Sequence, residues 1–273
     1  MAQHGNGDDG SAEDRFRGPL VGTRPALASN PTKLGRGPLL EVVVSSVSDS
    51  VAAEEGGAHR LELVSAIEEG GLTPDLGLVR AVRAVVRIPF RVMVRDNTGF
   101  GVRDEAEARH LYAFAQELAR LGVNGLVLGF IQEGKVDLAL LCRILSAAPL
   151  LNATFHRAFD EAAHSNEALV ALKSCEQIDR ILTAGGAGDL EQRARRLDGW
   201  RTHARPEITV MAGGGLDAAA LRYLRAHTEI REFHVGRAAR AQPNWEAPVD
   251  AARVHELAAI LRAPAAAAGG ADA

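Results

Sequence analysis

Short apolar runs alternate with longer amphipathic stretches through most of the chain. The apolar runs are rich in valine, isoleucine and leucine and are bounded by glycine and polar residues, a pattern typical of buried β-strands. We expect eight strands, over residues 40–44, 60–64, 90–95, 125–130, 152–158, 180–184, 208–212 and 232–236.

The stretches between these strands repeat apolar residues at intervals of three and four, which predicts helices. They cover residues 51–57, 76–86, 104–121, 138–147, 166–174, 189–204, 217–227 and 251–261. In the clearest of them, Ala108, Leu111 and Leu118 share one face. Asp104 and Asp217 stand where N-caps are expected, because a carboxylate there accepts from the free N–H groups of the first turn.

A strand followed by a helix, eight times over, indicates an α/β chain folded as a single (β/α)8 TIM barrel. The main alternative is a doubly wound open sheet, which less often needs eight evenly spaced strands. We expect the barrel to occupy residues 39–262. Residues 1–38 lack a sustained apolar period and are expected to form a disordered N-terminal extension, and residues 263–273 a flexible tail.

The composition narrows the class of protein. A formal net charge of −4 argues against a nucleic-acid partner bound through bulk charge, and 4% aromatic residues require an aliphatic core. No apolar run approaches the roughly 20 residues that span a membrane. With two cysteines and no targeting signal in the first residues, we expect a cytoplasmic protein.

Polar side chains interrupt strands that should be apolar on both faces in a barrel. The set comprises Glu41, Glu62, Arg91, Arg95, Thr154, His156, Arg157, Asp160, Thr183 and His234. Buried charges are costly unless paired, so one interpretation is a structural network in which Glu41 and Glu62 pair with Arg95 or Arg157. The interpretation we favour is a functional site at the carboxyl end of the barrel, where this fold places its active sites.

Two glycine clusters follow late strands. Gly185 lies after the sixth strand, and Gly213 and Gly214 lie after the seventh, just before a helix. Glycine allows backbone N–H groups to approach an anion, and a helix start adds partial positive charge. The clusters are therefore either an anion site or tight turns alone, and both interpretations stay open.

Taken together, these residues resemble the CutC family of copper homeostasis proteins. The matching segments are 40–41 (LE), 60–63 (RLEL), 69–74 (EGGLTP), 154–160 (TFHRAFD), 182–183 (LT), 211–213 (MAG) and 232–234 (EFH). The resemblance covers residues 39–240 in order. It implies a TIM barrel, a cytoplasmic location, a homo-oligomer and copper binding.

The chain departs from the family pattern at its thiols. Cysteines that family members commonly carry in the first strand and after the second are absent from residues 42–45 and 64–65. Cu(I) prefers thiolate and thioether ligands. Cys142 and Cys175 fall in predicted helices with no second cysteine nearby and are interpreted as packing residues.

Two hypotheses follow. In the first, a CutC-like protein binds copper, with the imidazoles of His156 and His234 offered to Cu(II) or Zn(II) and Glu41 or Glu62 as a third ligand. In the alternative, a lyase, isomerase or hydrolase acts on a small anionic or sugar-like metabolite. Its catalytic candidates are Glu41 or Glu62 as base, His156 as acid, and Asp160. Its ligand-binding candidates are Arg95, Arg157, Thr183, Gly185, Gly213 and Gly214.

Overall fold

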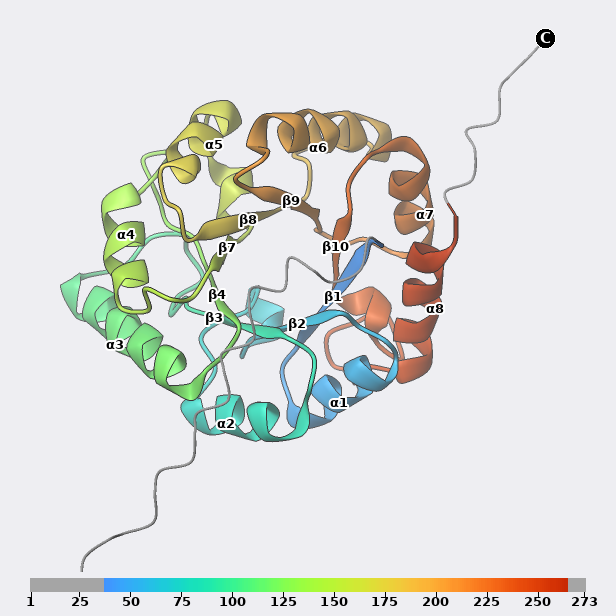
Figure 1. The fold of residues 1–273 in the computed structure, drawn as a ribbon, viewed down its shortest axis with the longest axis horizontal. Helices are drawn as coiled ribbons and strands as arrows, with labels where there is room; N and C mark the ends of the chain where they lie inside the picture. Colours follow the sequence, from blue (N-terminus) through green and yellow to red (C-terminus); the bar gives the residue numbers. More distant parts are fainter. Residues whose placement is uncertain (1–36, 265–273) are drawn as a thin grey trace, which may run out of the picture. The chain divides into compact units, whose positions relative to one another are not determined.

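The computed structural model describes residues 37–264, in which eight parallel strands close into a barrel (Figure 1). The strands are β1 (Leu39–Val44), β2 (Arg60–Leu63), β3 (Phe90–Met93), β4 (Gly125–Leu128), β7 (Ala153–Phe155), β8 (Ile178–Thr183), β9 (Thr209–Ala212) and β10 (Glu232–Val235). Strand β1 pairs with both β2 and β10, which closes the sheet. The predicted (β/α)8 barrel is confirmed, and the open-sheet alternative is wrong.

Eight α-helices form a ring around the strands (Figure 1). They are α1 (Val47–Glu55), α2 (Leu76–Val85), α3 (Glu105–Leu121), α4 (Leu138–Ser146), α5 (Ser165–Lys173), α6 (Leu190–Ala204), α7 (Ala218–His227) and α8 (Ala251–Arg262). Both predicted caps are present, since the carboxylates of Asp104 and Asp217 accept hydrogen bonds from backbone N–H groups in the first turns of α3 and α7.

The core has an outer and an inner part. The main apolar cluster, which includes Leu40, Phe155 and Phe233, contains residues from the barrel strands and from the helices. A separate small cluster of Val43, Val64, Ile67, Met93 and Val127 includes strand residues. In a barrel, alternate residues of each strand point into the interior. This second cluster fills part of that interior, and buried polar side chains occupy the rest.

Several elements differ from their predicted bounds. The strand expected over 152–158 ends at Phe155, because the chain turns at His156 into the 3-10 helix η2 (Arg157–Glu161). The helix expected from residue 51 begins at Val47, after Ser46, whose hydroxyl caps it. A hairpin of β5 (Ile131–Gln132) and β6 (Lys135–Val136) was not predicted, because two-residue strands are too short to show alternation. The remaining 3-10 helices are η1 (Ile67–Glu69) and η3 (Arg237–Ala239).

The expected extension over 1–38 and the tail over 263–273 lie outside the described residues except at 37–38 and 263–264. Within the described part of the chain, no helix combines the length and apolar character needed to cross a membrane.

Candidate functional site

A cavity of about 650 Å³ opens at the carboxyl ends of the strands. Six of the residues predicted from the sequence line it, namely Glu62, Arg95, His156, Arg157, Gly214 and His234. They come from β2, β10 and the segments after β3, β7 and β9. The structure therefore brings together residues that are up to 172 positions apart in the sequence, as the barrel topology predicts.

Two carboxylates and one imidazole cluster at the floor of this cavity. His234 Nδ1 lies 2.8 Å from Glu41 Oε1 and 3.2 Å from Glu62 Oε2. One ligand atom from each of the three residues lies within 4.8 Å of the others. Glu41 is 1% exposed and is absent from the cavity lining, so Glu62 and His234 are the members of this trio that face the cavity.

The pKa values of the three groups are shifted in different directions. Burial raises the pKa of Glu62 to about 7, and the nearby Glu41 carboxylate adds to this rise while His234 opposes it. Burial would also raise the pKa of Glu41, but the Arg60 guanidinium and His234 hold it well below its usual range. Burial disfavours protonated His234, yet Glu62 and Glu41 raise the pKa of its ring above the ordinary value. The result is one firmly ionised carboxylate beside a carboxyl and an imidazole that can exchange a proton.

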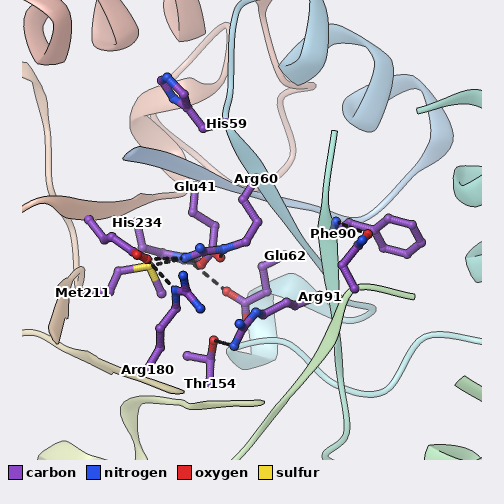
Figure 2. A network of polar contacts seen from close by, with 12 residues as sticks. Glu41, His59, Arg60, Glu62, Phe90, Arg91, Thr154, Arg180, Met211 and His234 are labelled. Carbon is purple, nitrogen blue, oxygen red and sulfur yellow. Dashed lines mark hydrogen bonds and ion pairs between the residues drawn. The ribbon is translucent and has the colours of Figure 1, made fainter. Parts of the chain in front are cut away.

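A buried network of ions contacts the trio through Glu41 (Figure 2). Arg60 donates to Glu41, to Glu232 at 2.8 Å and to the sulfur of Met211 at 3.2 Å. Arg180 donates to the same Glu232 oxygen at 2.8 Å. The predicted pairing of Glu41 with Arg95 or Arg157 is therefore corrected. The partner of Glu41 is Arg60, which follows from strand register because Glu41 and Arg60 stand opposite each other on β1 and β2.

The network continues to β3. Arg91 makes a bidentate pair with Asp179, at 2.7 Å for each bond, and donates to the Thr154 hydroxyl at 2.9 Å. These residues do not line the cavity. Arg91 and Thr154 are therefore part of the structural ion network. The structural interpretation describes this part of the barrel interior, and the functional interpretation describes the part that lines the cavity.

His156 has a different role from the one predicted. Its Nδ1 accepts a hydrogen bond from the Ala158 N–H at 3.1 Å, so the neutral ring carries its proton on Nε2. Burial, with the Arg95 charge nearby, lowers the pKa of His156 to about 3. A ring held neutral in this tautomer is neither an imidazolium acid at neutral pH nor a metal ligand through Nε2. It is a neutral hydrogen-bond donor, and Nε2 has no partner among the described residues.

Arg95 is predicted to bind a ligand, but its guanidinium holds two loops together. It donates to the carbonyls of Gly70, Gly71, Thr98 and Gly99. It also stacks on the Phe100 ring, with 4.9 Å from the guanidinium carbon to the ring centroid. The charge of Arg95 still faces the cavity, while its hydrogen bonds fix the rim.

Four other predicted residues lie outside the cavity lining. Asp160 accepts from the Thr183 hydroxyl and from the Ala184 N–H, and Thr183 accepts from the Gly185 N–H at 3.1 Å. Gly213 packs with its α-carbon against Leu182. Asp160, Thr183, Gly185 and Gly213 shape the loops behind the cavity wall, and the roles expected for them stay predictions.

Some lining residues were not predicted. Trp245 and Arg237 line the cavity from the segment after β10. Arg237 and Trp245 stack, with 5.7 Å from the guanidinium carbon to the ring centroid. The sequence signal for Trp245 was its rarity, because the chain has only two tryptophans and this one stands in a segment without helical or strand period.

The two cysteines also differ from expectation. Their side chains are close enough to interact, and burial, with Cys142 nearby, raises the pKa of Cys175 to about 11. Cys175 follows α5 and Cys142 lies on α4, and neither lines the cavity. The prediction that neither has a neighbouring cysteine is wrong, but no thiol joins the Glu41, Glu62 and His234 trio.

Comparison with known proteins gives one family. The model of the CutC family matches residues 38–239. A family protein CutC from Xanthomonas campestris pv. campestris strain B100 is 38% identical over 199 residues, which cover 71% of this chain and 81% of that protein. The structure of a provisionally named copper homeostasis protein CutC from Streptococcus agalactiae has a TM-score of 0.68 at 23% identity, covering 73% of this chain and 98% of the other.

Proposed function

Since the chain belongs to the CutC family, we propose that it is a copper homeostasis protein that binds copper at the floor of the barrel cavity. The ligands are Glu41, Glu62 and His234. The observation that carries the proposal is that one oxygen or nitrogen from each lies within 4.8 Å of the others in a buried position.

The donor set decides the oxidation state. Two carboxylates and an imidazole suit Cu(II), and Cu(II) lies at the top of the affinity order for first-row divalent ions at such sites. Neighbouring ligand atoms around a square-planar or tetragonal Cu(II) ion are about 2.8 Å apart when the bonds are about 2.0 Å. His234 Nδ1 is 2.8 Å and 3.2 Å from the two carboxylates, so an ion that replaces the shared proton requires only a small shift of these atoms. A Cu(I) site with thiolate ligands does not fit this cavity.

Calorimetric titration of metal-free protein with Cu(II) tests the proposal. We expect one ion per chain. The titration uses a His4→Ala variant, so that the imidazole of His4 does not bind copper outside the cavity. His234→Gln and Glu62→Gln should each weaken binding at least about tenfold, because each removes a ligand. His203→Gln, an exposed change on α6, is the matched control. Unchanged affinity in both cavity variants would contradict the proposal.

A second candidate function is supported by the size and lining of the cavity. A volume of about 650 Å³ exceeds what an ion needs and lies in the range of small-molecule sites. Arg157 and the His156 N–H add donors that a copper site does not use, and Arg95 adds positive charge. These features support an enzyme acting on a small anionic metabolite, with Glu62 facing the bound compound as the candidate base.

A thermal-shift screen of small phosphorylated, carboxylated and neutral compounds tests the second function. An anionic compound should raise the melting temperature of the wild-type protein and leave that of His156→Gln unchanged. A protein that copper stabilises and no anion stabilises would contradict it. The cytoplasmic location and homo-oligomeric state implied by the family resemblance are part of the proposal, and light scattering should give a mass of at least twice 28.9 kDa.

A further inference from the structure

The loops after β9 and β10 form another part of the cavity, separate from the trio on its floor. Gly214, Gly215 and Leu216 line it after β9, and Gly236, Arg237 and Ala238 line it after β10. These strands are the seventh and eighth of the barrel. In this fold the loops that follow them often bind phosphate, because their backbone N–H groups meet at one place.

The first loop exposes its backbone. Gly214 and Gly215 have φ of 77° and 80°, which disfavours other residues. A Cβ built on Gly215 would meet no atom within 4 Å, so this backbone borders open space. Within residues 37–264, the N–H groups of Gly214, Gly215 and Leu216 make no hydrogen bond. Helix α7 starts directly after this loop and directs its positive end there.

Two guanidinium groups lie at the same loops. Arg157 Nε is 3.7 Å from the position of a Cβ on Gly214. That Nε donates to Asp160 at 3.0 Å, which fixes the side chain, while its terminal nitrogens make no hydrogen bond to another described residue. Arg237 stacks on Trp245 and has no ion pair among the described residues. Two acids lie here: Asp160, which is paired with Arg157, and Asp217, whose carboxylate accepts from the Ala220 N–H at 2.8 Å.

An independent observation points to a ligand in this cavity. His156 is 3% exposed, lines the cavity, and its Nε2 has no partner among the described residues. Buried polar hydrogens in native proteins are nearly always paired, so this one requires an acceptor, and the cavity that His156 lines has room for a ligand that supplies it. The donor is neutral, which suits a carbonyl or hydroxyl oxygen.

We propose that the cavity binds a small phosphate monoester. Its phosphate lies against the N–H groups of Gly214 and Gly215 and the guanidinium groups of Arg157 and Arg237, and an oxygen of its organic part accepts from His156 Nε2. A phosphate dianion is favoured over a carboxylate, because its three terminal oxygens can use two guanidinium groups and a row of backbone donors together. This inference names the substrate class of the second candidate function and does not depend on copper.

Calorimetry with defined probes tests the inference. Glycerol 3-phosphate and inorganic phosphate should bind saturably at millimolar concentration or below, the ester more tightly, whereas glycerol should not bind. Arg157→Gln and Arg237→Gln should each weaken both phosphate probes at least fivefold. Arg109→Gln, an exposed change on α3, is the matched control. His156→Gln should remove the advantage of the ester and keep the affinity for inorganic phosphate.

Three outcomes would overturn the inference: no saturable binding of either phosphate probe at 10 mM, acetate binding as tightly as phosphate, or unchanged affinity in both arginine variants whose melting temperatures match the wild type. Arg157 and Arg237 are exposed, so these variants should fold even if His156→Gln does not. If phosphate probes fail while another anion stabilises the protein, the inference is wrong and the second candidate function stands. The copper titration is unaffected by either result.

Discussion

At the scale of single residues, one hydrogen bond decides what His156 can do. The sequence shows a histidine on a strand next to an arginine and predicts an acid or a metal ligand. The Ala158 N–H occupies Nδ1, and burial keeps the ring neutral. A backbone contact two residues away in the chain depends on the turn into η2, which a sequence pattern does not show. His156 is therefore a fixed neutral donor.

Nitrogen NMR of the imidazole rings measures this directly. His156 should show a proton on Nε2 and an unprotonated Nδ1, and both signals should stay constant from pH 5 to pH 8, because the pKa is lowered to about 3. An ordinary histidine changes over this range, with a pKa of about 6.5. A midpoint for His156 between pH 5 and pH 8 would refute the assignment.

At the scale of elements, the amino halves of the strands carry the ion network and the carboxyl halves carry the cavity. Glu232 stands at the first position of β10 and receives hydrogen bonds from both Arg60 and Arg180. Removing one member leaves buried charge without compensation, which is far more damaging than losing a surface pair. The network positions Glu41, and through it the floor of the cavity.

Substitutions of Glu232 and Glu229 compare the buried ion network with an exposed ion pair. Glu232→Gln should lower the free energy of unfolding by about 3 kcal/mol, because Arg60 and Arg180 lose their shared carboxylate. Glu229→Gln removes only an exposed pair with Arg231 and should change it by less than about 0.5 kcal/mol. Urea unfolding of both variants measures the difference. Similar values for the two would mean that the network does not stabilise the barrel.

The elements themselves are predictable where their patterns are long. All eight barrel strands and eight helices are found from apolar periodicity, and the caps Asp104 and Asp217 from residue type and position. The β5–β6 hairpin and the 3-10 helices are not found, since they span only two to five residues. Of the site, Glu62 and His234 were predicted to lie at the barrel mouth. Glu41 was predicted there too, but its pairing with Arg60 was not, because pairing across the interior depends on strand register.

At the scale of the whole molecule, buried ionisable groups change the free energy of unfolding in opposite directions as the pH rises. The Arg91 and Arg180 charges outweigh burial and hold the pKa of Asp179 below its usual range, and Arg60 and Arg180 do the same for Glu232. Their contribution is present above the ordinary carboxyl pKa and is lost as the pH falls. The pKa of Glu62 is raised to about 7, so its contribution is present below about pH 4.5 and is lost as the pH rises through 7.

The free energy of unfolding should therefore be largest near pH 5 to 6 and decrease on both sides. Urea unfolding of the metal-free protein from pH 3 to pH 9 measures this profile. Glu62→Gln should reduce the decrease on the alkaline side and leave the acid side unchanged. A wild-type profile that rises steadily from pH 5 to pH 8 would contradict these charge assignments.

The barrel has a cavity at the carboxyl ends of its strands, and the floor of this cavity is the proposed copper site. Anomalous diffraction at the copper edge, from crystals of the metal-free protein soaked in Cu(II), tests this most directly. The account predicts one strong peak among Glu41, Glu62 and His234, lost in His234→Gln. Anomalous density that lies only at Cys142 and Cys175, or anywhere else outside the cavity, would contradict it.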